Sequence, residues 1–394
     1  MDIEIGIGIS TKLDSTVAGR EAARSAYYQL GRRDPNIIIV FISTIYSQAD
    51  ILKGIRSVLK GTPLIGCSSA ASITPSGVFR DSVTVCALSS NSIRFSCAMG
   101  NKISKNARQA GSDAARESSS QKDAGKRRVY LMLSNCLSGN VADILRGTQE
   151  ILGTQFPIIG GSSTDEFEFQ KTYQYFNNNI YTDSVVGLVL SGEFGVSIGK
   201  AHGWQPIGKP HWVTRASANI ISEIDKKKAV ELYEEYLGKT FEELRIEGIG
   251  KLASNYPLGM YIKERKDYLL RAPLKADAQG SLILNAEVPE REYVSLMIGD
   301  KNLALQATKK ACIDALKTIR KSSAKFAIVF SDLARLQLLR KDSKKEAEII
   351  KDMLGPNVPF FGCYTCGEYG SLDARQNQEQ AHYHNHAIVI AVFS

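Results

Sequence analysis

The sequence predicts a mixed α+β protein of the α/β class, in which repeated strand-helix-strand-turn-strand units form mixed sheets in two domains. Three observations support this prediction. Apolar runs that end in serine recur three times along the chain. Each run is followed by a helical segment and a second apolar run, which leads into Gly, Cys and hydroxyl residues. A further apolar strand closes each unit, so the chain contains three copies of one supersecondary unit.

The three units share the same order of strands and turn. Their opening strands are NIIIVFIS (36–43), VYLMLS (129–134) and FAIVFS (326–331). Their turns contain GCSS (66–69), GGSS (160–163) and GCYT (362–365), and their closing strands are SVTVCAL (82–88), SVVGLVL (184–190) and AIVIAVF (387–393). Because α/β sheets bind ligands beyond the carboxyl ends of their strands, we expect the three turns to converge on one cavity. The alternative is a unit duplicated for packing alone.

The remaining elements of the first half follow from periodicity. Residues Ile3–Ile9 and Ile93–Met99 are predicted strands, and Ser15–Leu30 and Ala107–Ser119 are predicted helices. The segment GWQPIGKPHW (203–212) contains two glycines and two prolines, which break regular structure. It predicts a domain boundary, with residues 1–203 as the first domain, 204–212 as a linker and 213–394 as the second domain.

The second domain is predicted to begin with a strand or hairpin at Val213–Ile224. A helix is expected at Lys226–Leu237, with Asp225 as its N-cap. Short alternating segments between Tyr256 and Asp300 indicate antiparallel strands, and a helix at Asn302–Arg320 leads into the third unit.

Composition indicates a globular protein without a membrane span. The 394 residues are 43% hydrophobic and 23% charged, which is ordinary for a soluble protein. The net charge of +8 is scattered and lacks the interleaved aromatic residues of a single-stranded nucleic-acid groove, so no nucleic-acid partner is expected. No apolar run approaches the about 20 residues that a membrane helix needs, and the N-terminus has no basic n-region. We expect a cytoplasmic protein with no membrane insertion.

Seven cysteines, most of them in or beside apolar strands, fit reduced thiols better than disulfides. Cys67, Cys136, Cys363 and Cys366 each follow a strand of a repeated unit, so they could approach one another. Cys363 and Cys366 have CxxC spacing, which suits a metal or cluster site if a second pair of ligands is close. Buried, inert thiols are the alternative.

Several motifs, by their order and spacing, resemble those of the FIST family over nearly the whole chain. They are GCSSA (66–70), GGSS (160–163), GWQPIG (203–208), AVELYEEYLG (229–238), YPLGM (256–260), Arg271 within YLLRAPL, and PFFGCYTCGEYG (359–370). The resemblance implies a cytoplasmic sensory module that binds small molecules such as amino acids and signals to kinases, cyclases or chemoreceptors. It also implies a second hypothesis, because some stand-alone bacterial members are associated with haem or iron–sulfur cofactors and with nitric oxide sensing through a histidine kinase.

One departure from the family pattern concerns an acid. The third turn contains Gly367-Glu368, whereas the first turn has Ala71-Ser72 at the corresponding place. If this acid serves a ligand, the first turn cannot supply it.

Arg271 is the best anchor for an anionic ligand, because a guanidinium matches a carboxylate with two parallel hydrogen bonds. Asp165, Glu166 or Glu368 could then receive an α-amino group; the alternative is a solvent-facing Arg271 and acids paired with nearby bases. Turn hydroxyls could donate to the same ligand or bond their own backbone. The candidate ligand-binding residues are Cys67, Ser68, Ser69, Gly161, Ser162, Ser163, Asp165, Arg271, Tyr364, Thr365, Cys366 and Glu368.

His382, His384 and His386 alternate, so on one strand all three would point to the same face. Such a row could supply a haem or metal ligand, and His202 is a further candidate; a polar edge-strand face is the alternative. The candidate metal ligands are thus Cys363, Cys366 and His384, with no cofactor certain.

Three hypotheses follow. The first is a non-enzymatic cytoplasmic sensor that binds an amino acid or related small molecule and regulates a partner such as a histidine kinase in two-component signalling. The second is a haem or iron–sulfur sensor of nitric oxide or redox state. The third is a thiol enzyme based on Cys366. No nucleophile elbow, Walker loop or Ser-His-Asp order is present, so we expect a protein without enzymatic activity.

Overall fold

A computed structural model describes residues 2–120, 126–319, 323–371 and 380–394. It contains 29% helix and 39% strand, arranged in three six-stranded sheets and one eight-stranded sheet. The three six-stranded sheets each combine parallel and antiparallel pairs, so the predicted fold class is confirmed. Among the described residues, no helix is long and apolar enough to cross a membrane.

The three repeated units form the larger part of the molecule. The first contains β1 (Glu4–Ser10), α1 (Ser15–Gln29), β2 (Ile37–Ile42), α2 (Gln48–Arg56), β3 (Leu64–Ser68), β4 (Ala71–Thr74), β5 (Gly77–Arg80) and β6 (Val83–Ser89). The second contains β7 (Arg94–Asn101), α3 (Ile103–Ser119), β8 (Arg127–Ser134), α4 (Val141–Leu152), β9 (Ile158–Ser162), β10 (Gln174–Phe176), β11 (Asn179–Tyr181) and β12 (Ser184–Ser191).

The third unit is interrupted after its first strand. It contains β13 (Val196–His202) and then α8 (Lys301–Leu316), β22 (Phe326–Asp332), α9 (Leu333–Leu339), a 3₁₀ turn (Arg340–Ser343), α10 (Lys344–Leu354), β23 (Phe360–Thr365), β24 (Glu368–Ser371), β25 (Ala381–His384) and β26 (Ala387–Phe393). Helix α8 ends before the predicted end at Arg320, which lies outside the described residues.

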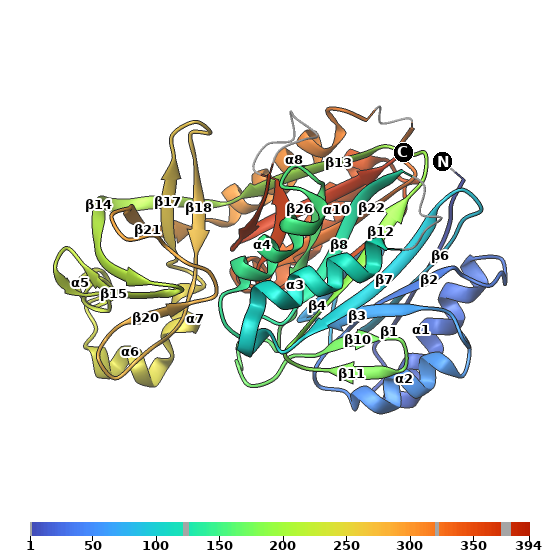
Figure 1. Cartoon of the computed structure of the whole chain (residues 1–394), viewed down its shortest axis with the longest axis horizontal. Coiled ribbons are helices and arrows are strands. Elements are labelled where there is room, and N and C mark those ends of the chain that lie inside the picture. Colours follow the sequence, from blue (N-terminus) through green and yellow to red (C-terminus); the bar gives the residue numbers. More distant parts are fainter. Residues whose placement is uncertain (1, 121–125, 320–322, 372–379) are drawn as a thin grey trace.

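The sheets are linked by an exchange of hairpins. Each unit places its β-hairpin at the edge of a sheet that belongs to another unit: β4–β5 lie beside β23 and β24–β25 beside β9. The third hairpin, β10–β11, lies beside β3 (Figure 1). The exchange is cyclic, because each sheet gives one hairpin and receives one. No unit can therefore complete its sheet alone.

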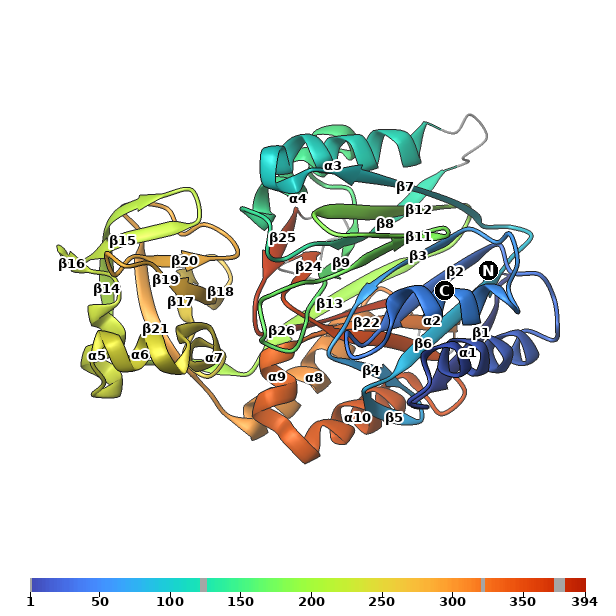
Figure 2. The ribbon, with the colours of Figure 1, turned by 90° about the horizontal axis from the view of Figure 1, so that it is seen from below.

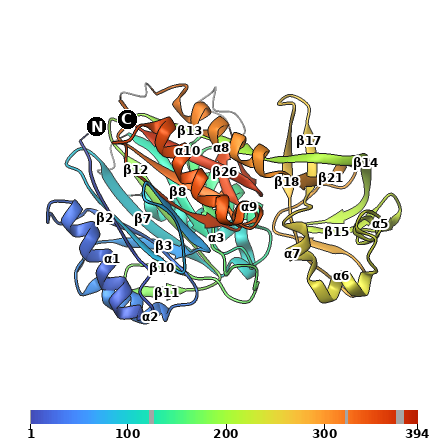
Figure 3. The same ribbon diagram turned by 180° about the vertical axis from the view of Figure 1, so that it is seen from behind.

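One hydrophobic core lies between the three sheets. Phe41 of β2 meets Phe330 of β22 and Phe361 of β23, with ring centroids 6.0 and 6.3 Å apart. Helices cover the outer faces: α1 and α2 on the first sheet, α3 and α4 on the second, and α8 and α10 on the third (Figures 2 and 3). These helices lie directly on the strands, because a Cβ at Gly8, Gly100 or Gly199 would be only 1.8, 1.9 or 2.0 Å from a helix carbonyl oxygen.

Residues Trp204 to Gly299, the inserted domain, form the eight-stranded sheet and lie to one side of the three units (Figure 1). Its elements are β14 (Trp204–Ser217), β15 (Ile220–Ile224), β16 (Lys227–Lys228), α5 (Glu231–Leu237), α6 (Phe241–Glu247), α7 (Ile249–Ala253), β17 (Leu258–Ile262), β18 (Asp267–Arg271), β19 (Pro273–Ala276), β20 (Leu282–Leu284) and β21 (Tyr293–Gly299). The segment 204–212, predicted as a linker, is part of β14. The chain after residue 300 returns to the sheet that contains β13.

The helix predicted at Lys226–Leu237 with Asp225 as its N-cap is wrong at its beginning. Helix α5 starts at Glu231, and Lys227–Lys228 pair with β15 instead. The physical reason is a tight turn, because Asp225 and Lys226 both have positive φ. The Asp225 carboxylate accepts the backbone N–H of Trp212 and bonds the His211 ring, so it does not cap a helix.

Candidate functional site at the meeting point of three turns

The three turns lie together and bind one another through their backbones. In each turn, the backbone N–H of the residue after the pair Ser68-Ser69, Ser162-Ser163 or Tyr364-Thr365 donates to a backbone carbonyl of another turn. These bonds run from Ala70 to Tyr364 (3.3 Å), from Thr164 to Ser68 (3.1 Å) and from Cys366 to Ser162 (2.8 Å). The three turns converge as expected from the sequence and are all buried, whereas a shared cavity between them stays a prediction.

The serine hydroxyls of the turns are occupied by protein groups. Ser68 Oγ donates to the Thr164 carbonyl and accepts the Tyr173 N–H, both at 3.0 Å. Ser162 Oγ lies 3.0 Å from Ser134 Oγ. The hydroxyls thus hold the turns in place in this structure.

Three further candidates are also part of the packing of the turns. Ser163 Oγ donates to the Ser134 carbonyl and accepts the side-chain amide of Gln174 at 2.7 Å. Gly161 makes room for Thr365, because a Cβ on Gly161 would lie 2.6 Å from Thr365 Cγ2. Ser69 is buried, and its backbone N–H donates to the Ile42 carbonyl.

The acid of the third turn occupies a position that each unit fills differently. The exchanged hairpins place Glu368 opposite Gly161, Gln174 opposite Cys67 and Ser72 opposite Cys363. Glu368, Gln174 and Ser72 are therefore equivalent residues. The threefold pattern carries one carboxyl, one amide and one hydroxyl at the same place.

Glu368 is a candidate residue with one unpaired oxygen. It is fully buried, and its Oε1 accepts the Thr365 hydroxyl at 2.8 Å, while its Oε2 has no hydrogen-bond partner. Burial raises the pKa of Glu368 well above its ordinary value, and the nearby Asp332 raises it further. Both effects favour the protonated carboxyl over the charged carboxylate.

Asp332 is a second buried acid beside Glu368. Its Oδ1 accepts the Ala334 N–H at 2.7 Å as the N-cap of α9, and its Oδ2 accepts the His386 N–H at 2.8 Å. Burial raises the pKa of Asp332 to about 6. Asp332 was not predicted as a site residue from the sequence. It could have been, because it directly follows the apolar run FAIVFS, and polar residues after apolar runs are what identified the turns.

Asn285 of the inserted domain reaches the third turn. Its side-chain amide donates to the carbonyl and to Sγ of Cys366, at 3.4 and 3.5 Å. Its Oδ1 is buried and has no hydrogen-bond partner. Nothing in the local sequence singles out Asn285, because its contact with Cys366 spans 81 residues of the chain.

Of the other predicted acids, Asp165 is used within its own loop and Glu166 faces Arg80 of β5. Asp165 accepts backbone N–H groups of Phe169, Gln170 and Lys171 at 3.0, 2.7 and 2.8 Å. Glu166 lies 3.7 Å from Arg80. Asp165 thus organises the loop between β9 and β10.

Arg271 links the inserted domain to the exchanged hairpin of the third unit. It is buried, and its guanidinium donates at 3.0 Å to the carbonyls of Glu287, Leu270 and Tyr383. Burial lowers the pKa of Arg271 to about 10. Its role as a ligand anchor stays a prediction, and in this structure the guanidinium binds carbonyl oxygens.

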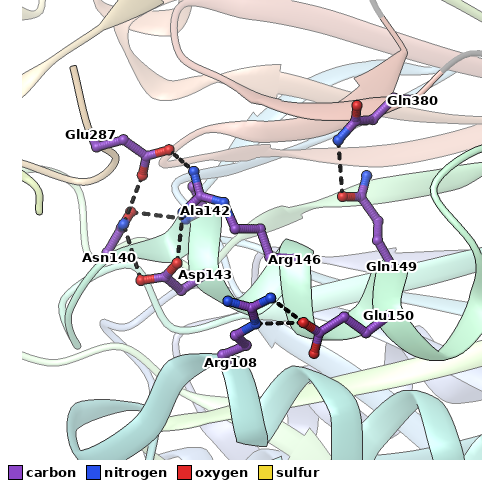
Figure 4. A network of polar contacts seen from close by, with 9 residues as sticks. All are labelled: Arg108, Asn140, Ala142, Asp143, Arg146, Gln149, Glu150, Glu287 and Gln380. Carbon is purple, nitrogen blue, oxygen red and sulfur yellow. Dashed lines mark hydrogen bonds and ion pairs between the residues drawn. The ribbon is translucent and has the colours of Figure 1, made fainter. Parts of the chain in front are cut away.

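A second junction lies beside Arg271. Glu287 accepts the Asn140 side-chain amide at 2.7 Å and pairs with Arg146 of α4. Figure 4 shows Asn140 and Arg146 directed toward Glu287, with Asp143 bonded to both of them. The contacts of Glu287 with Asn140 and Arg146 thus hold the inserted domain against the second unit.

The four cysteines near the turns form two separate pairs. Cys363 lies next to Cys67, and burial raises its pKa well above the ordinary value. The neighbouring Cys136 and burial do the same for Cys366. The CxxC residues thus have different partners. An iron–sulfur cluster needs four thiolates around one centre, and the described chain contains no group of three or more Cys, His, Asp or Glu placed to hold a metal ion.

The expected histidine row is wrong, because the chain turns after His384. His382 and His384 lie on β25 with ring centroids 6.5 Å apart, whereas His386 has φ +61° and packs edge-on against Trp204. His384 Nε2 bonds the Gly370 carbonyl at 3.0 Å. Burial lowers the pKa of His384 well below its ordinary value, that of His382 to about 4 and that of His386 to about 3.

Comparison with known proteins gives relatives without established activity. An uncharacterized protein of Mycobacterium bovis is 23% identical over 395 residues, covering 95% of each chain. An uncharacterized protein of Methanocaldococcus jannaschii is 26% identical over 180 residues, covering 43% of this chain and 34% of that one.

Among solved structures, cyanuric acid hydrolase from A. caulinodans has 7% identity and a TM-score of 0.37, with 100% of this chain and 99% of that one covered. PurLQS from Thermotoga maritima has 9% identity and a TM-score of 0.22, with coverages of 99% and 72%.

The family models match most of the chain. The FIST N domain matches residues 36–227, and the FIST C domain matches residues 229–371. FIST domains are ligand-binding sensory domains in signal transduction. This protein belongs to the FIST family.

Proposed function

We propose that this protein is a non-enzymatic cytoplasmic sensor that binds a small amino-bearing molecule, such as an amino acid, where the third turn meets the inserted domain. One observation carries the proposal. Glu368 Oε2 and Asn285 Oδ1 are buried oxygens without hydrogen-bond partners, and both residues lie next to Cys366. Buried polar atoms without partners are rare and costly, so their presence together points to a ligand.

The chemistry of these two atoms defines the ligand. The Asn285 amide oxygen accepts hydrogen bonds, and Glu368 does so at both oxygens once it is ionised, so a ligand that donates hydrogen bonds satisfies both residues. An ammonium group would supply up to three donors, and its charge would favour the ionised form of Glu368. Binding would then release the proton that Glu368 carries in the free protein. A bare anion fits less well, because the guanidinium of Arg271 donates to carbonyls and that of Arg335 is paired with Glu346, which leaves only its Nη1 without a partner.

The same position suits a sensor. Glu368 belongs to the repeated units and Asn285 to the inserted domain, so a ligand bound by both would stabilise one arrangement of the two parts. A ligand transmits a signal only if it binds two conformations with different affinity. The receiver in this proposal is a signalling protein such as a histidine kinase.

The first test is a thermal-shift panel of the twenty amino acids and simple primary amines, followed by titration calorimetry. Glu368→Gln keeps the shape of the side chain but cannot ionise, so we expect at least a tenfold loss of affinity for the amine that binds. Titration in buffers of different ionisation enthalpy should detect about one released proton for the wild type and none for Glu368→Gln.

Glu166→Gln is the matched control. It neutralises another acid near the turns, one that is only half-buried and that pairs with Arg80. Its affinity should equal that of the wild type. Equal affinity in Glu368→Gln, or a panel without any binder, would rule out the proposed site.

A further inference from the structure

Four aromatic side chains lie in a row on one face of the inserted domain's sheet. The strand order is β18-β17-β21-β14. Tyr268 of β18 lies opposite Tyr261 of β17, and Tyr293 of β21 lies opposite Trp212 of β14. Met260 pairs with Val294, so the same antiparallel register, continued by one residue, places Tyr261 beside Tyr293. Directly opposite residues share a face, so all four rings belong to one row, here called the aromatic row.

The aromatic row is open to solvent at its centre. Tyr293 and Tyr261 are 55% and 49% exposed, and Trp212 and Tyr268 are half-buried beside them. Ring centroids are 4.6 Å apart for Trp212 and Tyr293 and 5.1 Å apart for Tyr261 and Tyr268. Strands are spaced by about 4.8 Å, so the row extends over roughly 14 Å.

The four rings are not part of the hydrophobic core of the inserted domain. The opposite face of the same strands carries Leu258, Val294 and Leu296, which are buried in that core. On the face of the aromatic row, the inner end packs against α9 through Leu270 and Met297. No element in the described part of the chain covers the outer end of this face. Exposed aromatic patches on soluble proteins usually mark interaction sites.

Positive charge lies at one end of the row. The turn between β17 and β18 carries exposed Lys263 and Lys266, with Glu264 as the exposed acid between them. At the other end, the exposed Arg291 stands between Glu290 and Glu292, so these three residues bring no net positive charge there. An acidic partner would therefore meet complementary charge at the β17–β18 turn and aromatic surface along the row.

We propose that the aromatic row is a docking surface for a partner protein, and that its occupant is an extended acidic segment containing proline or aromatic residues. Extended proline-rich segments dock on aromatic surfaces at low entropic cost, because their backbone is already ordered. Tyrosine and tryptophan also contribute the largest binding energies at protein interfaces.

A chain of contacts joins this surface to the proposed ligand site, and this step rests on the proposed function. Trp204, on the face of the aromatic row, meets the His386 ring with centroids 4.7 Å apart. The His386 N–H is bound to Asp332, the acid beside Glu368. A ligand that moves the inserted domain would thus also move the docking surface.

The test is selection of a phage-displayed library of random 12-residue peptides on the full-length protein, followed by fluorescence anisotropy of the enriched peptides. We expect enriched peptides with net negative charge and with proline or aromatic residues. Tyr261→Ala/Tyr293→Ala should weaken their binding at least tenfold without lowering the melting temperature, because both rings are half exposed. Tyr28→Ala is the matched control, since Tyr28 is 51% exposed on α1, away from the row.

Several outcomes would overturn the proposal. These are the absence of enriched peptides, enrichment of basic peptides, unchanged affinity in the double variant, or displacement of the peptide by oligothymidylate, which would indicate a nucleic-acid surface. Loss of a wild-type dimer in the double variant, seen by sedimentation, would assign the row to a second copy of the chain. Amino-acid binding measured on the same double variant separates failure of this surface from failure of the ligand site.

Discussion

Oδ2 of Asp332 accepts the backbone N–H of His386 at 2.8 Å, so the acid that begins α9 also fixes the turn between β25 and β26. The two residues respond to burial in opposite ways. Burial raises the pKa of Asp332 to about 6 and lowers that of His386 to about 3. The titrations of Asp332 and His386 therefore change the stability of the protein in opposite directions as the pH changes.

Stability should fall on acidification because of His386. Its folded-state pKa of about 3 is below the ordinary value of 6.5, so the unfolded state binds more protons between these values. The contribution is complete above pH 6.5 and decreases by up to about 2 kcal/mol between pH 6.5 and 5. His386→Asn, which tolerates the positive φ, should flatten this slope in urea unfolding at pH 7 and pH 5.

Asp332 supplies the control, because its sign is opposite. Its raised pKa costs stability as pH rises from about 4 to about 6, so Asp332→Asn should steepen the loss on acidification. An unchanged slope in both variants would contradict the assignment.

A buried ion pair between Arg335 and Glu346 contacts the third turn at Tyr364. Both side chains are fully buried, and Arg335 also donates to the Ala304 carbonyl and the Thr308 hydroxyl at 2.9 and 2.8 Å. The Tyr364 hydroxyl donates to Glu346. Glu346→Ala would leave the guanidinium buried without its charge partner, and we expect a loss of about 3–5 kcal/mol in the free energy of unfolding.

The double variant Arg335→Met/Glu346→Leu tests the cause of that loss. It removes both charges and keeps apolar volume, so it should be more stable than Glu346→Ala alone. Chemical denaturation of the three proteins measures this difference. A double variant less stable than the single one would show that the polar network, and not the unpaired charge, sets the cost.

Arg271 provides a test of domain contact. Arg271→Lys keeps a positive charge, but a single ammonium cannot reproduce the planar fork that reaches the carbonyls of Glu287, Leu270 and Tyr383. Both Arg271→Lys and Arg271→Ala should speed proteolytic cleavage between the inserted domain and the repeated units. Arg215→Ala, which removes an exposed arginine of β14, should leave cleavage unchanged. Slow cleavage in Arg271→Ala together with lost ligand binding would instead favour the ligand-anchor role.

The repeated units could be predicted because their signals are local. The run NIIIVFIS and the turn after Pro63 reveal a strand and its end within a few residues, and the structure has β2 and β3 there. The exchange of hairpins could not be predicted, since β4 pairs with β23 almost 300 residues away. For the same reason, the sequence did not show that Glu368 lies opposite Gly161 of another unit.

Site residues that bind backbone groups were the hardest to predict. Arg271 looks like a carboxylate anchor in the sequence, but its partners here are carbonyl oxygens, which every residue has. Asn285 becomes notable only through its contact with Cys366. His386 left the expected row because positive φ reverses the chain after β25, and no proline or glycine marks that turn.

The glycine that begins each turn motif gives the last prediction. Gly66, Gly160 and Gly362 are equivalent, and a Cβ at these positions would lie 2.2, 1.8 and 1.8 Å from a carbonyl oxygen of the neighbouring parallel strand. Gly362→Ala should therefore push β23 away from β22 and cost more than about 3 kcal/mol, because the contact is with backbone that cannot rotate away. Gly31→Ala isolates the conformational cost of a residue with positive φ, since Gly31 has φ +68° and open space around it, and it should lose only about 1 kcal/mol. Urea unfolding of the two variants gives the comparison. Equal losses of stability in the two variants would mean that the sheet accommodates the methyl group. In that case, the close approach of β22 and β23 would not explain the glycine at the beginning of the turn.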